Sequence, residues 1–133
     1  MKKARFFEQN GERQYARAQR IWQVLVGYVM FEQDRSGMGS GLITYGDLAE
    51  ILGYDRRAAV TLGAPLGYIH RFCEENELPH LNAIVVREDT GIAGWDEMYP
   101  DRKRHLEEQK KVKNYDWFRV RVPQAGTLKN YPT

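Results

Sequence analysis

The spacing of apolar residues predicts a first amphipathic helix over residues 13–33, RQYARAQRIWQVLVGYVMFEQ. Apolar side chains recur there at intervals close to 3.6 residues, at Tyr15, Ala18, Trp22, Leu25, Val29 and Met30. Three arginines decorate the first half of this segment, so we expect a core helix with a solvated basic end. The next residues, 34–41, are rich in Gly and Ser and predict a loop.

A second, shorter amphipathic helix is predicted to begin after Thr44. The Thr44 side chain can cap the helix, and Asp47 can return a bond to the Thr44 backbone N–H, which makes a capping box. One apolar face follows, at Tyr45, Leu48, Ala49 and Leu52. Gly53 supplies the left-handed residue that ends the helix after two to three turns.

A third helical segment follows at once, because Asp55 is a good N-cap for residues 56–77. Its core stripe is predicted at Leu62, Leu66, Ile69 and Cys73. Pro65 lacks a backbone donor and the neighbouring glycines weaken a helix. We therefore expect a kink, or two helices joined near Gly63 and Ala64.

Three further segments complete the pattern. Residues 83–86 are β-prone, residues 88–91 predict a turn, and residues 92–95 are expected to return as a second strand. Residues 101–114 predict a charged, exposed helix with six basic and three acidic side chains. Residues 117–123, WFRVRVP, alternate as in a strand; the inward side chains would be Phe118, Val120 and Val122, and the outward ones Arg119 and Arg121.

The order helix, loop, helix, turn, helix, strand, turn, strand is typical of a winged helix. We therefore predict an α+β fold: a helix-turn-helix with a small antiparallel sheet as the wing, an extra N-terminal helix and a charged C-terminal helix. A chain of 133 residues fits one domain. We expect that domain to span residues 1–123 and residues 124–133 to form a loosely ordered tail.

Composition narrows the class of protein. Hydrophobic residues make up 42% and charged residues 29%, as in soluble globular domains. No apolar run approaches the roughly 20 residues of a membrane span, and the N-terminus shows no secretory signal. The single cysteine, Cys73, suits a reducing compartment, so we expect a cytoplasmic protein without a membrane partner. The net charge of +2 permits nucleic-acid binding if basic residues share one face.

Two segments carry a family resemblance. GLITYGDLAEILG, residues 41–53, resembles the signature that opens the DNA-binding half of O6-alkylguanine-DNA alkyltransferases and alkyltransferase-like proteins. LPHLNAIVVREDTGIAG, residues 78–94, resembles the part with the Pro-Cys-His-Arg-Val or Pro-Trp-His-Arg-Val motif, an apolar strand and a Gly turn. The resemblance covers about fifty residues. It implies a winged helix that lays a helix in the minor groove of DNA.

The sequence differs from the family at the motif that accepts the alkyl group. Pro79 matches the family proline, but His80 stands where the alkyl-accepting cysteine or the tryptophan would be. Leu81 and Asn82 stand at the His and Arg positions of the motif. Alkyl transfer needs a thiolate activated by a nearby base. We therefore predict no catalytic residue and no enzymatic activity.

The resemblance also suggests contacts to DNA. Tyr45 matches the family tyrosine beside a DNA phosphate near a flipped nucleotide. The arginine that fills the gap in the base stack falls on Ala59 without gaps, and Arg56 or Arg57 matches it only with a shift.

The residues themselves indicate a phosphate-binding surface. Arg56 and Arg57 open the second helix of the pair, where backbone N–H groups and the helix dipole favour anions. Thr61 lies about one and a half turns later and Arg87 lies on the wing. The predicted nucleic-acid-binding residues are Tyr45, Arg56, Arg57, Thr61 and Arg87. For the arginines, the alternative is an ordinary solvated surface, which also applies to the basic residues of 101–114.

Three functional hypotheses remain. The first is a non-catalytic nucleic-acid-binding protein, with duplex DNA as its partner and no cofactor. The second is a winged-helix module that binds a partner protein. The third is a small enzyme or metal site around His70, Cys73 and His80, whose spacing H-x2-C-x6-H offers three ligands without a fourth. We predict no metal site from that pattern, and no acid or oxyanion site is visible beside a Cys–His pair.

Overall fold

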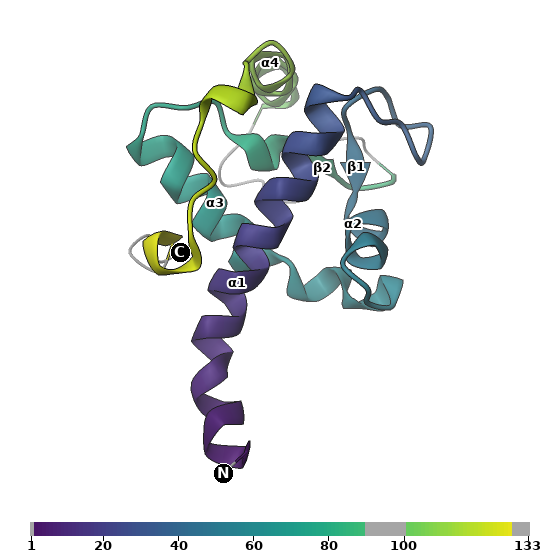
Figure 1. The fold of residues 1–133 in the computed structure, drawn as a ribbon. Coiled ribbons are helices and arrows are strands. Elements are labelled where there is room, and N and C mark those ends of the chain that lie inside the picture. Colours follow the sequence, from purple (N-terminus) through teal and green to yellow (C-terminus); the bar gives the residue numbers. More distant parts are fainter. Residues whose placement is uncertain (1, 90–100, 129–133) are drawn as a thin grey trace.

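The computed structural model describes residues 2–89 and 101–128, with side chains from residue 14 onward. The fold is mostly helical and contains one two-stranded sheet (Figure 1), which is consistent with the predicted α+β class. The α-helices are α1 (Lys2–Met30), α2 (Tyr45–Ile51), α3 (Gly63–Glu75), α4 (Arg102–Lys113) and α5 (Ala125–Leu128). The 3-10 helices are η1 (Arg56–Thr61), η2 (Leu81–Ile84) and η3 (Trp117–Arg119), and the strands are β1 (Ile43–Thr44) and β2 (Val85–Val86). None of the described helices combines the length and apolar character that a membrane span requires.

Helix α1 supplies one side of the core, as its apolar period predicts. The buried stripe is Ala18, Ile21, Trp22, Leu25 and Val29. Trp22 packs edge-on against Phe72 of α3, with ring centroids 5.5 Å apart. In the view of Figure 1, α3 and α2 lie to either side of α1. The helix begins at Lys2 and ends at Met30, earlier at both ends than residues 13–33.

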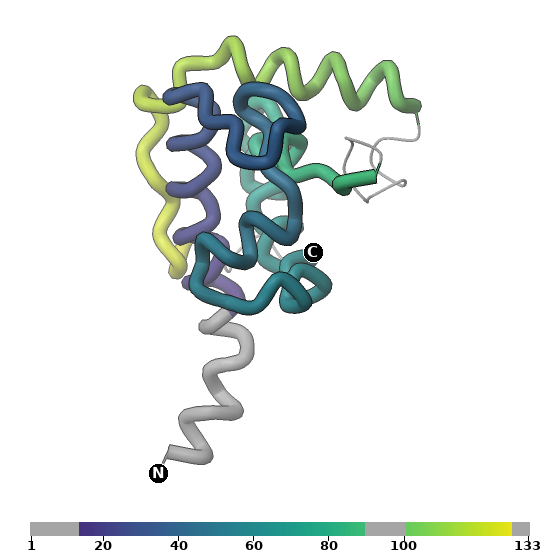
Figure 2. The backbone as a smooth tube through the Cα atoms, turned by 90° about the vertical axis from the view of Figure 1, so that its right-hand side faces the viewer, coloured from purple at the N-terminus to yellow at the C-terminus, as the bar shows by residue number. Residues whose placement is uncertain are grey.

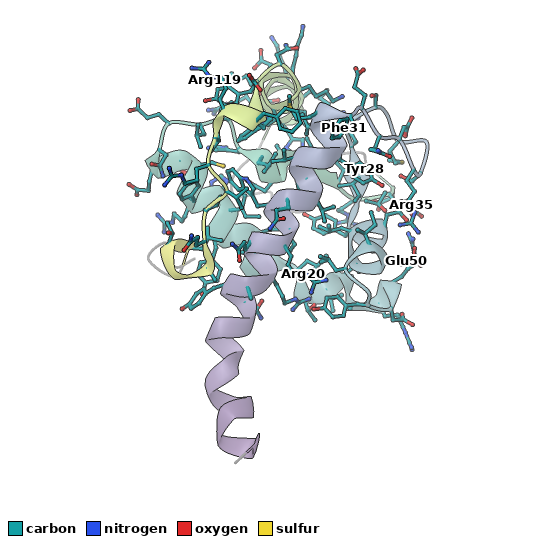
Figure 3. The ribbon with its side chains drawn as sticks, in the orientation of Figure 1. Arg20, Tyr28, Phe31, Arg35, Glu50 and Arg119 are labelled. Carbon is teal, nitrogen blue, oxygen red and sulfur yellow. The ribbon has the colours of Figure 1, made fainter. Side chains whose placement is uncertain are left out.

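The basic half of α1 is not only a solvated end. Arg17 is buried, and its Nη2 donates to Thr61 Oγ1 at 3.0 Å. Arg20 Nη2 donates to the Leu52 carbonyl at 3.0 Å. Both arginines therefore attach the α2–η1 unit to α1, and Figure 3 labels Arg20 on the side of α1 that faces this unit.

The predicted pair of capped helices is present. Thr44 Oγ1 accepts from the Asp47 backbone N–H at 3.1 Å and starts α2. Gly53, at φ +92°, turns the chain, and Asp55 then caps η1 through the Arg57 N–H at 2.8 Å. The third helical segment divides as expected, because η1 ends at Thr61 and α3 begins at Gly63. Pro65 falls in the first turn of α3, where its missing N–H leaves no helical bond unmade.

The antiparallel sheet predicted for the wing is wrong for the described residues. The two strands are parallel, with Ile43 opposite Val85 and Thr44 opposite Val86. Both strands are buried, and a short apolar strand without polar alternation suits such a position. Ala83 and Ile84, expected in the strand, lie in η2. The expected returning strand, residues 92–95, lies outside the described residues.

The C-terminal part departs furthest from expectation. Helix α4 forms as predicted and is capped by Asp101, but His105, Gln109 and Val112 are buried rather than exposed. Gln109 Nε2 donates to the Ala83 carbonyl at 3.1 Å, which attaches α4 to η2.

The strand predicted over residues 117–123 is absent from the described residues, which hold η3 there. Two of the three inward positions are wrong as well, because Phe118 is 63% exposed and Val122 is also exposed, whereas Val120 is partly buried against the core. Trp117 is buried instead, since Asp116 caps a tight turn through the Phe118 N–H at 3.2 Å and directs the indole inward. Within the predicted tail, residues 125–128 form α5 and Leu128 is fully buried, while residues 129–133 lie outside the described residues.

Candidate functional site

Three of the five predicted contact residues surround one surface depression. Tyr45, Arg56 and Arg87 line it, and its volume is about 340 Å³. The parallel register explains this proximity, because Thr44 pairs with Val86 and the next residues along the two segments are Tyr45 and Arg87. Arg56 enters from η1, which follows α2 after the Gly53 turn. The remaining lining residues are Thr44, Gly46, Val86, Glu88 and Asp89.

Arg56 forms salt bridges with three carboxylates around this depression. Its Nη1 lies 2.6 Å from Asp47 Oδ1 and 3.2 Å from Glu50 Oε1, and its Nη2 lies 3.1 Å from Glu88 Oε1. Asp47 thus accepts from Arg56, and among the described residues we find no return bond to the Thr44 N–H of the kind a capping box requires. The guanidinium joins α2, η1 and the residues after β2.

Gly46 makes room for the Arg56 side chain. A Cβ at this position would lie 2.6 Å from Arg56 Nη2 and 2.7 Å from Cζ. The glycine of the TYG segment therefore allows the guanidinium to lie directly over the first turn of α2. Arg35 joins the same network through Glu50 Oε1 at 3.1 Å, and Figure 3 shows Arg35 and Glu50 on the same side of the molecule.

The predicted contact residues also differ in how exposed they are and in which side chains they already bind. The Arg57 side chain is 91% exposed and pairs with its neighbour Asp55 at 3.1 Å. Arg87 pairs with Asp89, also at 3.1 Å. Thr61 lies at the far end of η1, where its hydroxyl accepts from Arg17 and donates to the Ala58 carbonyl at 2.7 Å. Thr61 does not line the depression.

The face around the depression is not the positive surface that the sequence predicted. Four arginines (Arg35, Arg56, Arg57 and Arg87) stand there among five carboxylates (Asp47, Glu50, Asp55, Glu88 and Asp89). Residues 14–89 carry seven basic and ten acidic side chains, whereas residues 101–121 carry eight basic and four acidic ones. Among the side chains that the structure describes, the positive excess therefore lies in residues 101–121, which include α4 and η3.

The salt bridges around Arg56 lower the pKa of Asp47. Burial by itself raises the pKa of this carboxyl, but the hydrogen bond and charge of Arg56, helped by Arg35, bring the pKa below its ordinary value of 3.8. The unfolded chain therefore takes up a proton at Asp47 at a higher pH than the folded chain does. The stabilisation from ionised Asp47 is complete above pH 3.8 and is lost as the pH falls through the lower folded pKa.

We expect Asp47→Asn to be less stable than the wild type at neutral pH, and the difference to shrink as the solution is acidified. The amide cannot lose a proton, so it carries no such pH dependence. Thermal unfolding of both proteins between about pH 6 and about pH 2 measures this difference. Glu75→Gln, at an exposed position of α3, is the control. A difference that stays constant through acidification would contradict the role given to Asp47.

A second cluster brings the histidines of the metal hypothesis together. His70 Nε2 lies 3.2 Å from Glu74 Oε2, and the rings of His70 and His80 have centroids 4.2 Å apart. Cys73 does not belong to this cluster. It is fully buried, and burial raises the pKa of its thiol to about 12, so no thiolate forms near neutral pH. The spacing of His70 and Glu74, four residues apart on a helix, was the signal that the sequence analysis missed.

Exposed aromatic side chains mark a third surface. Phe31 is 68% exposed, and its ring meets that of Phe118 edge-on at 5.9 Å. A cavity of about 420 Å³ lies between the end of α1, the following loop and the end of α4, with Met30, Gly41 and Lys113 in its lining. Figure 3 labels Phe31 at this end of the molecule.

These three surfaces are the candidate sites among the described residues. The depression combines Tyr45 with arginines held by carboxylates, the histidine cluster combines nitrogen and oxygen donors, and the aromatic surface is apolar. Comparison with protein-family models, with curated proteins and with solved structures finds no match to this chain.

Proposed function

We propose that the protein is a non-catalytic nucleic-acid-binding protein whose partner is duplex DNA. The proposed scaffold is a helix-turn-helix of the winged-helix type, related to that of alkyltransferase-like proteins. The observation that supports the proposal best is the placement of Tyr45 and Arg87 around one depression at the start of α2. The capped segment η1, which follows α2, carries Arg57 directly after Arg56, and Arg56 lines that depression.

The proposed contacts follow from how each side chain is held. Arg57 and Arg87 pair with exposed carboxylates, and exposed ion pairs contribute only about 0–1 kcal/mol. Both guanidinium groups can therefore exchange a carboxylate for a DNA phosphate at small cost. Tyr45 would place its hydroxyl beside the same strand of phosphates.

Arg56 takes a different part in the proposal. Three carboxylates surround its guanidinium, so we assign it the task of holding α2, η1 and the residues after β2 together. Thr61 is left out, because its hydroxyl attaches η1 to α1 and not to the depression.

In this proposal, the positive charge of α4 supplies the electrostatic attraction for DNA that the depression lacks. It packs on η2, the segment that leads directly into β2 and Arg87. Figure 2 shows α4 crossing above the chain that ends at residue 89. A polyanion would be drawn towards this basic side and repelled from the acidic remainder of the described surface.

Binding to a mixed-sequence duplex tests the proposal. Fluorescence anisotropy over a range of salt concentrations is expected to give a steep loss of affinity with salt. The double variant Arg57→Gln, Arg87→Gln should bind about tenfold more weakly at low salt, and its slope of log K against log salt should fall by about 1.8. Both residues lie outside the core, so the fold should be retained.

Arg71→Gln is the matched control, since it removes one exposed arginine on α3 away from the depression. It should leave duplex affinity within about twofold of the wild type. Because the control removes one charge and the double variant removes two, a loss of binding free energy in the control of about half that in the double variant would show a general charge effect and remove the proposed contact site.

The exposed Phe31–Phe118 pair favours a second candidate, a module that binds a partner protein. Exposed aromatic rings beside a cavity are typical of protein interfaces. This candidate expects no salt-dependent affinity for duplex DNA. The same titration therefore separates the two functions.

A further inference from the structure

We propose that His70, Glu74 and His80 form a binding site for a zinc ion, separate from the depression at Tyr45. His70 and Glu74 come from consecutive turns of α3, and His80 comes from the segment that leads into η2. One donor atom from each of the three side chains lies within 4.8 Å of the other two. Two imidazoles and one carboxylate are a common set of zinc ligands that leaves a fourth position for water.

The distances between the ligand atoms suit a zinc ion with tetrahedral coordination. Zinc–ligand bonds of about 2.0–2.1 Å place neighbouring ligand atoms about 3.3 Å apart. The separation of His70 Nε2 and Glu74 Oε2 is 3.2 Å. The His80 ring stands beside His70 at 4.2 Å between centroids, and one of its nitrogens lies within 4.8 Å of the donor atoms of His70 and Glu74. Cys73 points into the core and takes no part.

Asn82 provides an independent observation. Its Nδ2 lies 3.4 Å from His70 Nδ1, while its Oδ1 is buried without a hydrogen-bond partner in the described part of the chain. In the exchanged orientation of the amide, Oδ1 accepts from the His70 Nδ1–H, and Nδ2 takes the buried position that has no hydrogen-bond partner in the described part of the chain. That arrangement keeps the proton on Nδ1 and leaves the Nε2 lone pair of His70 available to an ion held between His70 and Glu74.

Glu108 orients His80 in a similar way. Its Oε2 accepts from the His80 backbone N–H at 2.8 Å and lies 3.8 Å from His80 Nδ1. A carboxylate beside Nδ1 favours the proton on that nitrogen and the lone pair on Nε2. Both rings therefore have a neighbour that orients them.

The cluster is also open to solvent. His70 is buried, His80 is half-buried and Glu74 is exposed, so an ion can enter from the Glu74 side without unfolding α3. Nitrogen and carboxylate donors together select zinc over magnesium or calcium, which prefer oxygen donors alone.

Zinc titration of the full chain, free of affinity tags and of metal, tests the site. A chromophoric chelator in competition should report one saturable zinc per chain. His80→Ala and Glu74→Gln should each weaken binding by about 10- to 100-fold. Glu75→Gln removes the adjacent exposed carboxylate from the same helix and should leave the affinity unchanged.

Thermal unfolding and cobalt spectra complete the test. Excess zinc should raise the melting temperature of the wild type and not that of His80→Ala, because only a folded site stabilises by binding. Cobalt should bind without a thiolate charge-transfer band, and Cys73→Ala should keep its zinc.

The proposal would be overturned by the absence of saturable binding, by equal weakening in Glu75→Gln, or by loss of zinc in Cys73→Ala. The last result would instead restore the His70, Cys73 and His80 set. Because Glu74→Gln changes an exposed side chain, its effect on zinc cannot be attributed to misfolding.

Discussion

Replacing Trp117 with alanine is expected to lower the free energy of unfolding by about 3–5 kcal/mol. The indole is only 1% exposed and packs edge-on against Trp22 at 5.6 Å, so its removal leaves a cavity beside α1. Its Nε1 also donates to the Val112 carbonyl at 2.8 Å, which attaches η3 to the end of α4. Urea denaturation of both proteins measures the change.

Two controls accompany this substitution. Trp117→Phe keeps an aromatic ring but loses the bond to Val112, so its cost should be smaller, about 1–2 kcal/mol. Phe118→Ala changes the exposed neighbour and should cost about 0.5 kcal/mol or less. If Phe118→Ala proved as destabilising as Trp117→Ala, the inward strand positions predicted from the alternation would be right and the structure of this segment would be wrong.

Leu128→Ala is expected to destabilise the protein by about 2–4 kcal/mol. Leu128 is fully buried, and α5 places it against the core that α1 and α3 share. A loosely ordered tail would tolerate the substitution without measurable change. Urea denaturation separates these two expectations.

Thr127→Ala is the matched control for Leu128→Ala, since it truncates the adjacent, exposed side chain of the same short helix. It should change stability by less than about 0.5 kcal/mol. Comparable losses in the two variants would indicate that the helix itself, and not burial of Leu128, stabilises the fold.

The candidate site was only partly predictable from the sequence. Tyr45, Arg56 and Arg87 were expected to share a face, and they do surround one depression. The charge of that face was not predictable, because it depends on which carboxylates fold next to each arginine. Glu88 reaches Arg56 across 32 residues of sequence, and no local pattern indicates such a pair.

The sequence by itself determined that α1, α2, η1, α3 and α4 form, and it determined the caps of α2 and η1. Their signals are local: the apolar period of α1, the cap at Thr44, the positive φ at Gly53 and the cap at Asp55 act within a few residues. Tertiary structure alone decided that β1 pairs with β2 in parallel, that Trp117 and Leu128 enter the core, and that Glu74 rather than Cys73 joins the histidines. Those outcomes depend on which distant surfaces bury one another, and the free energy of that burial outweighs short alternating patterns such as WFRVRVP.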